Sequence, residues 1–276
     1  MLKRLIALMM VAVLLAVLTA ACGKKKALKD EGDDESDTPK TPYVVKGNEG
    51  TITGTVSFEG EAPKPDPLDP SSDAFCNANM PDKFIDNVKI KDGKLADVFV
   101  YVTGGGLEQY RFEPPAEANL DQKGCRYVPR VLGLVVGQKL SITNSDKTGH
   151  NIHPQPKNNP SWNQVQGPGA PPIEKTFGKA EELIPVKCDQ HPWMKAWISV
   201  LNHPFFARSE ENGTYTISGV PPGTYTLVFR HEKFGTQRVQ VTVPPSGTVT
   251  KDVVFKAGGG ASPAATAAPL VLPYVQ

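Results

Sequence analysis

The residues of this chain with the clearest chemical meaning lie in one short stretch, residues 186–194. It reads Val-Lys-Cys-Asp-Gln-His-Pro-Trp-Met, so Cys188, His191 and Met194 offer a thiolate, an imidazole and a thioether close together. The sulfur donors are soft and imidazole is borderline, a set that suits a copper ion cycling between Cu(I) and Cu(II). The stretch therefore predicts a metal-binding loop that still needs a second nitrogen ligand.

That second histidine is supplied by Thr-Gly-His-Asn-Ile-His at residues 148–153. The segment follows the strand-like residues 139–144, and a strand end can present a side chain to the later loop. Both His150 and His153 are candidates. A zinc ion on the same cysteine and histidines is the alternative, although zinc gains nothing from a thioether. Taken singly, the residues also fit a buried cysteine near a loop histidine and a methionine packed in the core.

Together the two segments resemble the cupredoxin, or blue copper, family, and most closely its amicyanin- and plastocyanin-like members. The amicyanin ligand loop reads Cys-Thr-Pro-His-Pro-Phe-Met, which has the spacing of residues 188–194 and a proline at the position of Pro192. The amicyanin His-Asn-Val-His resembles residues 150–153. The resemblance covers roughly residues 119–202.

This resemblance implies one type 1 copper ion. His150, Cys188 and His191 would form the trigonal ligand set, and Met194 would be the weak axial ligand. Only the family register favours His150 over His153.

The resemblance also assigns roles around the ligands. Asn151 would lie just outside the ligand shell and could tie the two ligand loops together by hydrogen bonds. The edge of the His191 ring would reach the surface as the exit for electrons, with Pro192 and Trp193 forming an apolar rim.

The beginning of the chain has the features of an export signal. A basic start is followed by an apolar run over residues 5–18, shorter than the roughly 20 residues of a membrane-spanning helix, and then by Thr-Ala-Ala-Cys. This resembles a bacterial lipoprotein signal, with Thr19 where leucine is usual. Residues 1–21 are therefore expected to be removed and Cys22 to carry lipid, which anchors the exported protein to a bacterial membrane on its periplasmic side or at the cell surface. An ordinary cleaved signal, with Cys22 discarded or free, is the alternative.

Two further segments lack the apolar residues of a packed domain. Residues 22–50 carry a lysine run and then an acidic run, and such a segment cannot bury enough surface to offset its ordering entropy. We expect a disordered tether there, and a disordered Ala/Pro-rich tail over residues 258–276.

The intervening chain consists of short alternating runs bounded by turn residues, such as residues 52–58 and 98–102. This pattern predicts an all-β sandwich. The family resemblance implies a Greek-key copper domain, which we place over residues 51–204. Residues 70–80 and 178–183 could each form a short helical turn.

Residues 205–257 show a second pattern of strands and tight turns. They are similar to the carboxypeptidase regulatory-like (transthyretin-like) module through an Asn-Gly turn at Asn212 and the run Pro-Pro-Gly-Thr-Tyr at residues 221–225. This resemblance implies a small β-sandwich for support or contact, with no catalytic group. About fifty residues is short for the module, so its first strands could come from residues 51–58 and 96–102. The copper domain would then be an insertion in it, and the sequence leaves this open.

The chain has four cysteines. With Cys22 assigned to lipid and Cys188 to metal, Cys76 and Cys125 remain, and in an oxidising compartment we predict that they form a disulfide. On the chain-entropy model such a bridge stabilises the fold by roughly 4 kcal/mol. Two separate thiols are the alternative, because sequence does not give the distance between their α-carbons.

Composition excludes some classes of function. The formal net charge is +1, and no basic cluster indicates a nucleic-acid partner. The sequence shows no Gly-x-Ser-x-Gly, no His-Glu-x-x-His and no Cys-x-x-Cys-His, so we expect neither an enzyme nor a small-molecule substrate. The leading hypothesis is an exported, membrane-tethered blue copper protein that carries single electrons between redox protein partners. A copper carrier or storage protein and a metal-free surface adhesion or support module are the alternatives.

Overall fold

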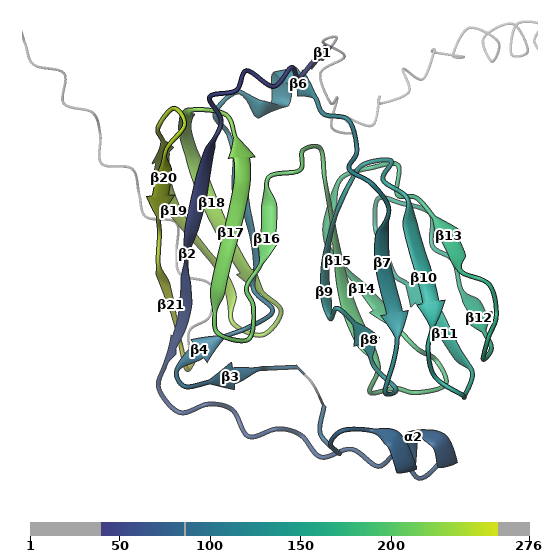
Figure 1. Cartoon of the computed structure of the whole chain (residues 1–276). Coiled ribbons are helices and arrows are strands. Elements are labelled where there is room, and N and C mark those ends of the chain that lie inside the picture. The colour runs from purple at the N-terminus through teal and green to yellow at the C-terminus, as the bar shows by residue number, and fades with distance from the viewer. Residues whose placement is uncertain (1–39, 86, 259–276) are drawn as a thin grey trace, which may run out of the picture. The chain divides into compact units, whose positions relative to one another are not determined.

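A computed structural model describes residues 40–85 and 87–258, and β-strands dominate it (Figure 1). The predicted all-β fold is confirmed. Within these residues no helix has the length and apolar character needed to cross a membrane. The signal over residues 1–21, Cys22, and the tail beyond Gly258 lie outside the described residues.

One group of strands, which we call the site sandwich, contains both histidine- and cysteine-bearing segments. Its sheets have the orders β13-β10-β7-β8 and β12-β11-β14-β15-β9. The strands in chain order are β7 (Ala118–Gln122), β8 (Tyr127–Val128), β9 (Val131–Val135), β10 (Leu140–Asn144), β11 (His150–Pro154), β12 (Gln164–Gln166), β13 (Ile173–Lys175), β14 (Glu181–Lys187) and β15 (Lys195–Leu201). Branched side chains such as Ile142, Ile152 and Ile198 form its buried core, as is typical of pleated surfaces with one apolar face.

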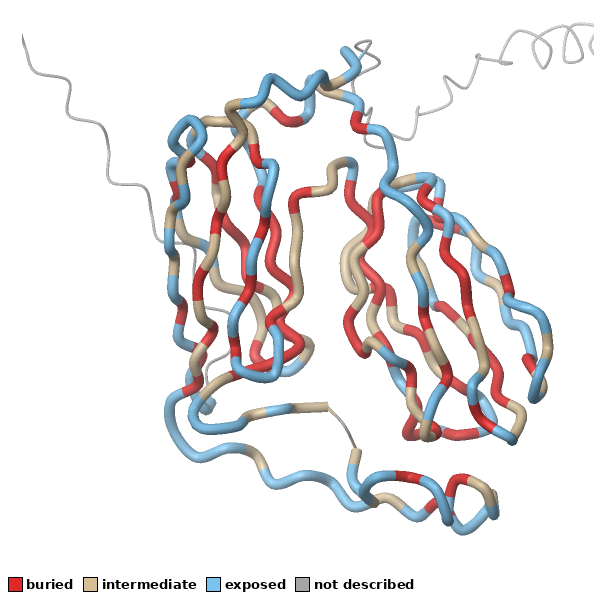
Figure 2. Tube along the Cα trace, viewed as in Figure 1, coloured by how far each residue is buried: buried red, intermediate tan, exposed pale blue. Residues whose placement is uncertain are grey.

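The second group, which we call the module sandwich, has sheet orders β16-β5-β18-β19 and β17-β2-β4-β3, with β20 and β21 also paired along β2. Its strands are β2 (Gly50–Glu59), β3 (Ile90–Lys91), β4 (Lys94–Leu95), β5 (Phe99–Thr103), β16 (Phe206–Arg208), β17 (Thr214–Val220), β18 (Gly223–His231), β19 (Gly235–Val243), β20 (Thr248–Thr250) and β21 (Val253–Lys256). Burial alternates along β2 (Figure 2). Ile52 and Val56 are among its buried residues and belong to the core. This period of two is what places one face of a strand inside.

The strand pairing differs from the copper-domain boundaries of residues 51–204. Strand β2 pairs with β17, and β5 pairs with β16 and β18, so both early strands belong to the module sandwich. The site sandwich therefore lies between β5 and β16 in the chain, which is the insertion that the sequence left open. A strand with alternating apolar residues could pack in either sandwich, and only its hydrogen-bonded partner strands show to which sandwich it belongs.

The expected disorder of residues 22–50 is wrong for the end of that range. Strand β1 (Thr41–Pro42) pairs in parallel with β6 (Tyr110–Arg111). The ring of Tyr43 packs against Tyr110 and Phe112, with centroids 5.4 and 5.0 Å away. The first large aromatic residue of the tether is thus already part of the packed structure.

One of the two expected helical turns is present. Helix α2 (Ala74–Asn79) begins after Asp73, whose carboxylate accepts a hydrogen bond from the backbone N–H of Cys76, an ordinary N-cap. Residues 181–187 instead form β14. A 3₁₀ turn, Leu107–Gln109, is the only other helix among residues 40–85 and 87–258.

The disulfide predicted between Cys76 and Cys125 is present, with the two α-carbons 5.7 Å apart. It joins α2 to the turn between β7 and β8. Both cysteines are fully buried.

Ionic contacts connect the two sandwiches near the strand that follows the candidate metal loop. Arg130 donates from Nε and Nη2 to Glu232 Oε1 at 2.9 and 2.6 Å, and from Nη1 to the Lys195 carbonyl at 3.0 Å. The indole of Trp197 donates to Glu232 Oε2 at 2.6 Å. The Arg130 side chain is 4% exposed, so Glu232 rather than water compensates its positive charge.

We predict that Glu232→Ala lowers the free energy of unfolding by about 3 kcal/mol, because it leaves a buried guanidinium without its counter-charge. Chemical denaturation measures the change. The control is Glu59→Ala, which removes an exposed pair with Lys256 and should cost less than about 1 kcal/mol. Equal effects of the two substitutions would contradict the prediction.

Candidate metal centre

Three potential metal ligands converge in the site sandwich. His150 is the first residue of β11, Cys188 directly follows β14, and His191 lies in the turn that leads to β15. The two Nδ1 atoms are 2.9 Å apart, and His191 Nδ1 is 3.6 Å from Cys188 Sγ. One ligand atom from each residue lies within 4.8 Å of the others, and all three residues are buried.

The loop that carries Cys188 and His191 is closed by its own backbone. Lys187 pairs with Lys195 across the antiparallel strands β14 and β15, so residues 188–194 form a hairpin connection. Within it, the Cys188 N–H donates to the Met194 carbonyl at 3.2 Å, and the Met194 N–H donates to the His191 carbonyl at 2.9 Å. The spacing read from the sequence thus becomes a compact turn, and the Met194 side chain is buried in the same core.

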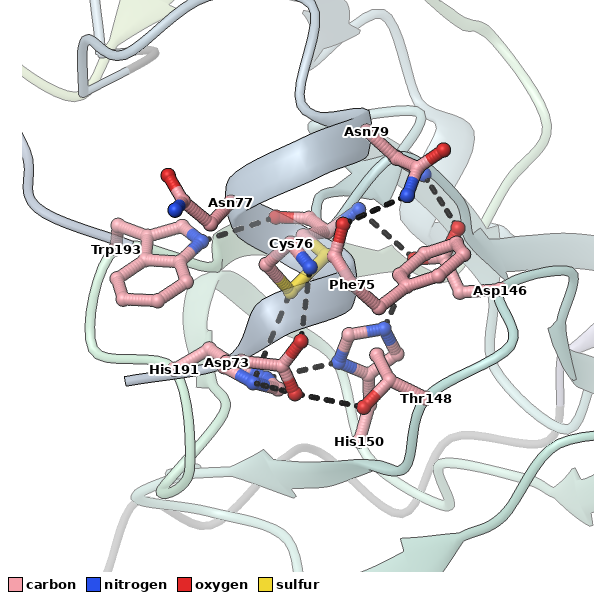
Figure 3. The surroundings of a disulfide bond; sticks show 12 residues. Asp73, Phe75, Cys76, Asn77, Asn79, Asp146, Thr148, His150, His191 and Trp193 are labelled. Atoms are coloured by element: carbon pink, nitrogen blue, oxygen red, sulfur yellow. Dashed lines mark hydrogen bonds and ion pairs between the residues drawn. A yellow bond between two sulfur atoms is a disulfide. The ribbon is translucent and has the colours of Figure 1, made fainter. Parts of the chain in front are cut away.

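A carboxylate faces the outer nitrogen of each imidazole. His150 Nε2 is 2.9 Å from Asp146 Oδ2, and His191 Nε2 is 3.4 Å from Asp73 Oδ2 (Figure 3). A carboxylate accepts hydrogen bonds, so it favours the tautomer with hydrogen on Nε2 and a lone pair on Nδ1.

With both rings in this tautomer, two lone pairs face each other at 2.9 Å beside a thiol. Such a group requires either a proton or a cation between its members. A metal ion bound by both Nδ1 atoms and the sulfur satisfies all three donors at once, and the donor set fits a soft or borderline metal.

The electrostatics keep the sulfur available as a thiolate. Burial raises the pKa of Cys188, but hydrogen bonds from His150 and His191 outweigh it and lower this pKa to about 6. For His150, burial acts to lower the pKa, but the hydrogen bonds to Asp146 and Cys188 outweigh burial and raise this pKa to about 9. Without metal, both shifts favour a thiolate beside an imidazolium, and metal binding then displaces that proton.

Asn151 connects the two ligand loops. Its Oδ1 accepts from the N–H of Asp189 at 2.6 Å and lies 3.2 Å from Cys188 Sγ. Its Nδ2 donates to Asp189 Oδ2 at 3.2 Å and to Asn163 Oδ1 at 2.7 Å. The backbone N–H of Asn151 also points to Cys188 Sγ at 3.5 Å. These contacts fix the sulfur relative to β11.

His153 lies outside the cluster. Its Nδ1 contacts Asp189 Oδ2 at 2.9 Å, and its side chain is 22% exposed. The strand places His150 and His153 on different sides, because they are an odd number of residues apart. The geometry therefore brings His150, and not His153, to Cys188.

The expected surface position of the His191 edge is wrong. His191 is 3% exposed, and its Nε2 faces Asp73 and, at 3.8 Å, Cys76 Sγ (Figure 3). Trp193 is also buried rather than part of an exposed rim, and its indole donates to the Cys125 carbonyl at 3.2 Å. Only Pro192 is exposed.

Sequence reasoning identified Asn151 but missed the other residues around the ligands. Asp146 stands four residues before His150, a spacing that could have been noticed, whereas Asp73 is 118 residues from His191 and nothing local marks it. Asn163, which directly precedes β12, contacts both Asn151 and Asp189.

Two neighbouring groups also bring three potential ligands together, Asp73 with Cys76 and His191, and Cys125 with Asp146 and His150. Their sulfur atoms are joined in the disulfide and are not thiolates. Among the described residues, Cys188 is the cysteine with a free thiol.

Comparison with known families gives one match. The model of the carboxypeptidase regulatory-like domain matches residues 189–256, about a quarter of the chain. The match begins inside the metal loop, whereas in the structure β15 pairs with β9 of the site sandwich. It omits β2 and β5, which complete the module sandwich. No curated protein matches this chain.

Solved structures similar to the chain include several copper proteins. A Cu-containing nitrite reductase from Thermus scotoductus SA-01 is 24% identical over 31% of this chain and 22% of its own, with a TM-score of 0.29. The purple cupredoxin from Nitrosopumilus maritimus is 22% identical over 30% of this chain and 98% of its own, with a TM-score of 0.26. A Cu(I) mutant of amicyanin is 18% identical over 37% and 97%, with a TM-score of 0.27. This chain spans about a fifth of the nitrite reductase and nearly all of the two smaller proteins.

We predict that His150→Ala and His153→Ala differ sharply in metal binding. His150→Ala removes one of the converging donors. Loss of a residue that only hydrogen-bonds to a metal ligand typically lowers affinity ~10 to 100-fold, so loss of the ligand itself should weaken Cu(II) binding by more than that. His153→Ala removes only a contact to Asp189 and should bind nearly as the wild type. Competition with a chelator of known affinity measures both. Weaker binding by His153→Ala than by His150→Ala would reverse the assignment.

Proposed function

We propose that this chain is a copper protein that carries single electrons between redox protein partners. His150, Cys188 and His191 would hold one copper ion, with Met194 as the weak axial ligand. The observation that carries the proposal is the convergence of two Nδ1 atoms and one thiol in a buried cluster, with a carboxylate on each outer nitrogen. When bound, copper supplies one-electron chemistry.

The protein's part in this proposal is to hold its donors still. Asp146 fixes the ring of His150. Asn151 donates from its backbone N–H to the sulfur of Cys188, and its Oδ1 accepts from the N–H of Asp189, the next residue. Donors that keep their positions in both Cu(I) and Cu(II) states reduce the structural rearrangement needed for each electron transfer. Burial of all three side chains keeps water out of the ligand sphere, and no pocket for a substrate is needed.

A copper carrier would use the same donors but must release its metal readily. The covered His191 edge and the closed hairpin favour retention over exchange. The discriminating observation is whether bound copper survives a mild chelator and cycles reversibly at an electrode.

The cellular setting belongs to the same proposal. We propose that the chain is exported and tethered through a lipid on Cys22. The Cys76–Cys125 disulfide supports an oxidising compartment. Intact-mass spectrometry of membrane-derived protein should find diacylglycerol-modified Cys22 as the first residue, and a mature chain beginning elsewhere would refute the anchor.

The proposed function predicts the colour of the copper-loaded full-length protein. Charge transfer from a thiolate to Cu(II) gives intense visible absorption, so Cys188→Ser should be colourless even where some metal stays bound. His191→Ala should differ, because added imidazole can refill the open position. An unchanged visible spectrum in Cys188→Ser, or a colourless copper-loaded wild type, would contradict the blue-copper assignment.

Met194→Gln should keep copper and colour while its reduction potential falls. The amide oxygen is a harder donor than the thioether and favours Cu(II) over Cu(I), each fall of about 59 mV meaning a tenfold change in that preference. Voltammetry measures the potential. Outright loss of copper from Met194→Gln would show that Met194 is not a weak axial ligand.

A further inference from the structure

The outer edge of His191 is closed by a segment from outside the site sandwich. Residues 68–84, which we call the cap segment, follow β2 in the chain and contain helix α2. The segment closes on itself, since the Leu68 N–H donates to the Lys83 carbonyl at 2.9 Å. Asp73 and Cys76 of this segment lie 3.4 and 3.8 Å from His191 Nε2 (Figure 3).

Both oxygens of Asp73 have fixed partners. Oδ1 accepts from the backbone N–H of Cys76 at 2.8 Å, and Oδ2 accepts from Thr148 Oγ1 at 2.7 Å. Because Thr148 precedes His150 by two residues, Oδ2 lies between the two histidine-bearing segments. These two hydrogen bonds therefore hold the carboxylate in place independently of its contact with the His191 ring.

The cap segment is anchored covalently next to this contact. Cys76 is bonded to Cys125, and the Cys125 N–H donates at 2.8 Å to Asp146 Oδ2, the oxygen that faces His150 Nε2. A second attachment joins Arg126 to Asp82 at 2.7 Å. The disulfide and this ion pair therefore tie the segment to the site sandwich beside His191.

We propose that Asp73 is a positioning residue for His191. It accepts the Nε2 hydrogen, which directs the Nδ1 lone pair toward Cys188, and with the cap segment it seals this edge of the ligand from solvent. The inference rests on the proposed copper site, and it adds how one ligand is held and what would slow the release of copper.

A carboxylate on the far nitrogen of a metal-bound imidazole fixes the tautomer and raises the basicity of the ring, and loss of such a partner typically costs ~10 to 100-fold in affinity. A more basic ligand favours Cu(II) over Cu(I). Removal of the Asp73 charge should therefore speed copper loss and raise the reduction potential.

The test compares Asp73→Asn with Asp69→Asn in the full-length protein. Asparagine is as good an N-cap as aspartate, so Asp73→Asn retains α2 while it removes the charge from His191. Asp69 belongs to the same segment and is exposed, and its carboxylate accepts from the Ser71 N–H at 2.9 Å. Asp69→Asn thus removes the same charge away from the ring.

We expect copper loss to excess chelator to be about tenfold faster or more in Asp73→Asn, with a higher reduction potential, and to be unchanged in Asp69→Asn. Thr148→Val, which removes the hydroxyl that orients Asp73, should give a smaller change in the same direction. If the two asparagine variants match in both release rate and potential, the inference is overturned.

A second readout needs no copper. Nuclear magnetic resonance of the His191 ring in the metal-free protein should report hydrogen on Nε2 in the wild type and in Asp69→Asn, and a less deshielded Nε2 proton in Asp73→Asn, which lacks the carboxylate acceptor. A wild-type ring with hydrogen on Nδ1 would overturn the positioning role. A wild type that binds no copper but shows the expected tautomers would instead refute the proposed function and leave the Asp73 contact standing.

Discussion

The constraint on which the site depends is the approach of two imidazole nitrogens to 2.9 Å beside a buried thiol. Nitrogen lone pairs at that distance repel unless a proton or a cation lies between them. The surrounding contacts do not relieve this conflict but enforce it, because Asp146 and Asp73 occupy the outer nitrogens and Asn151 holds the sulfur. A cluster that must hold a proton or a cation between its nitrogens suits a metal ion that displaces the proton.

From spacing alone, the sequence could predict contacts between site residues that are close together in the chain, but not contacts between residues that are far apart in it. The sequence predicted that Cys188, His191 and Met194 lie close together, because all three belong to one hairpin and few residues separate them. The disulfide could be predicted by elimination, since only Cys76 and Cys125 lacked a role. Closure of the His191 edge could not, because it depends on where a segment more than a hundred residues earlier comes to rest.

The fold shows the same division. Alternation of apolar and polar residues identified strands such as β2 and predicted the all-β class correctly. The pattern says which face of a strand is buried but not against which sheet, so the early strand could be assigned to either sandwich until its pairing with β17 was known. Likewise, the sequence pattern places Tyr43 in a polar tether, and only its neighbours Tyr110 and Phe112 show that it is packed.

The insertion explains how one sandwich can supply part of the other's site. Strands β5 and β16, which flank the site sandwich in the chain, are antiparallel neighbours, with Phe206 opposite Tyr101. Both ends of the inserted chain are therefore held about one strand spacing apart, roughly 5 Å. The cap segment, in contrast, leaves the module sandwich between β2 and β3 and returns to it, yet it brings Asp73 and Cys76 to the ligand edge. A chain cut to the inserted strands would keep His150, Cys188 and His191 but lose the carboxylate and the disulfide that cover them. The segment between two strands of the module sandwich thus forms the outer wall of the candidate metal centre.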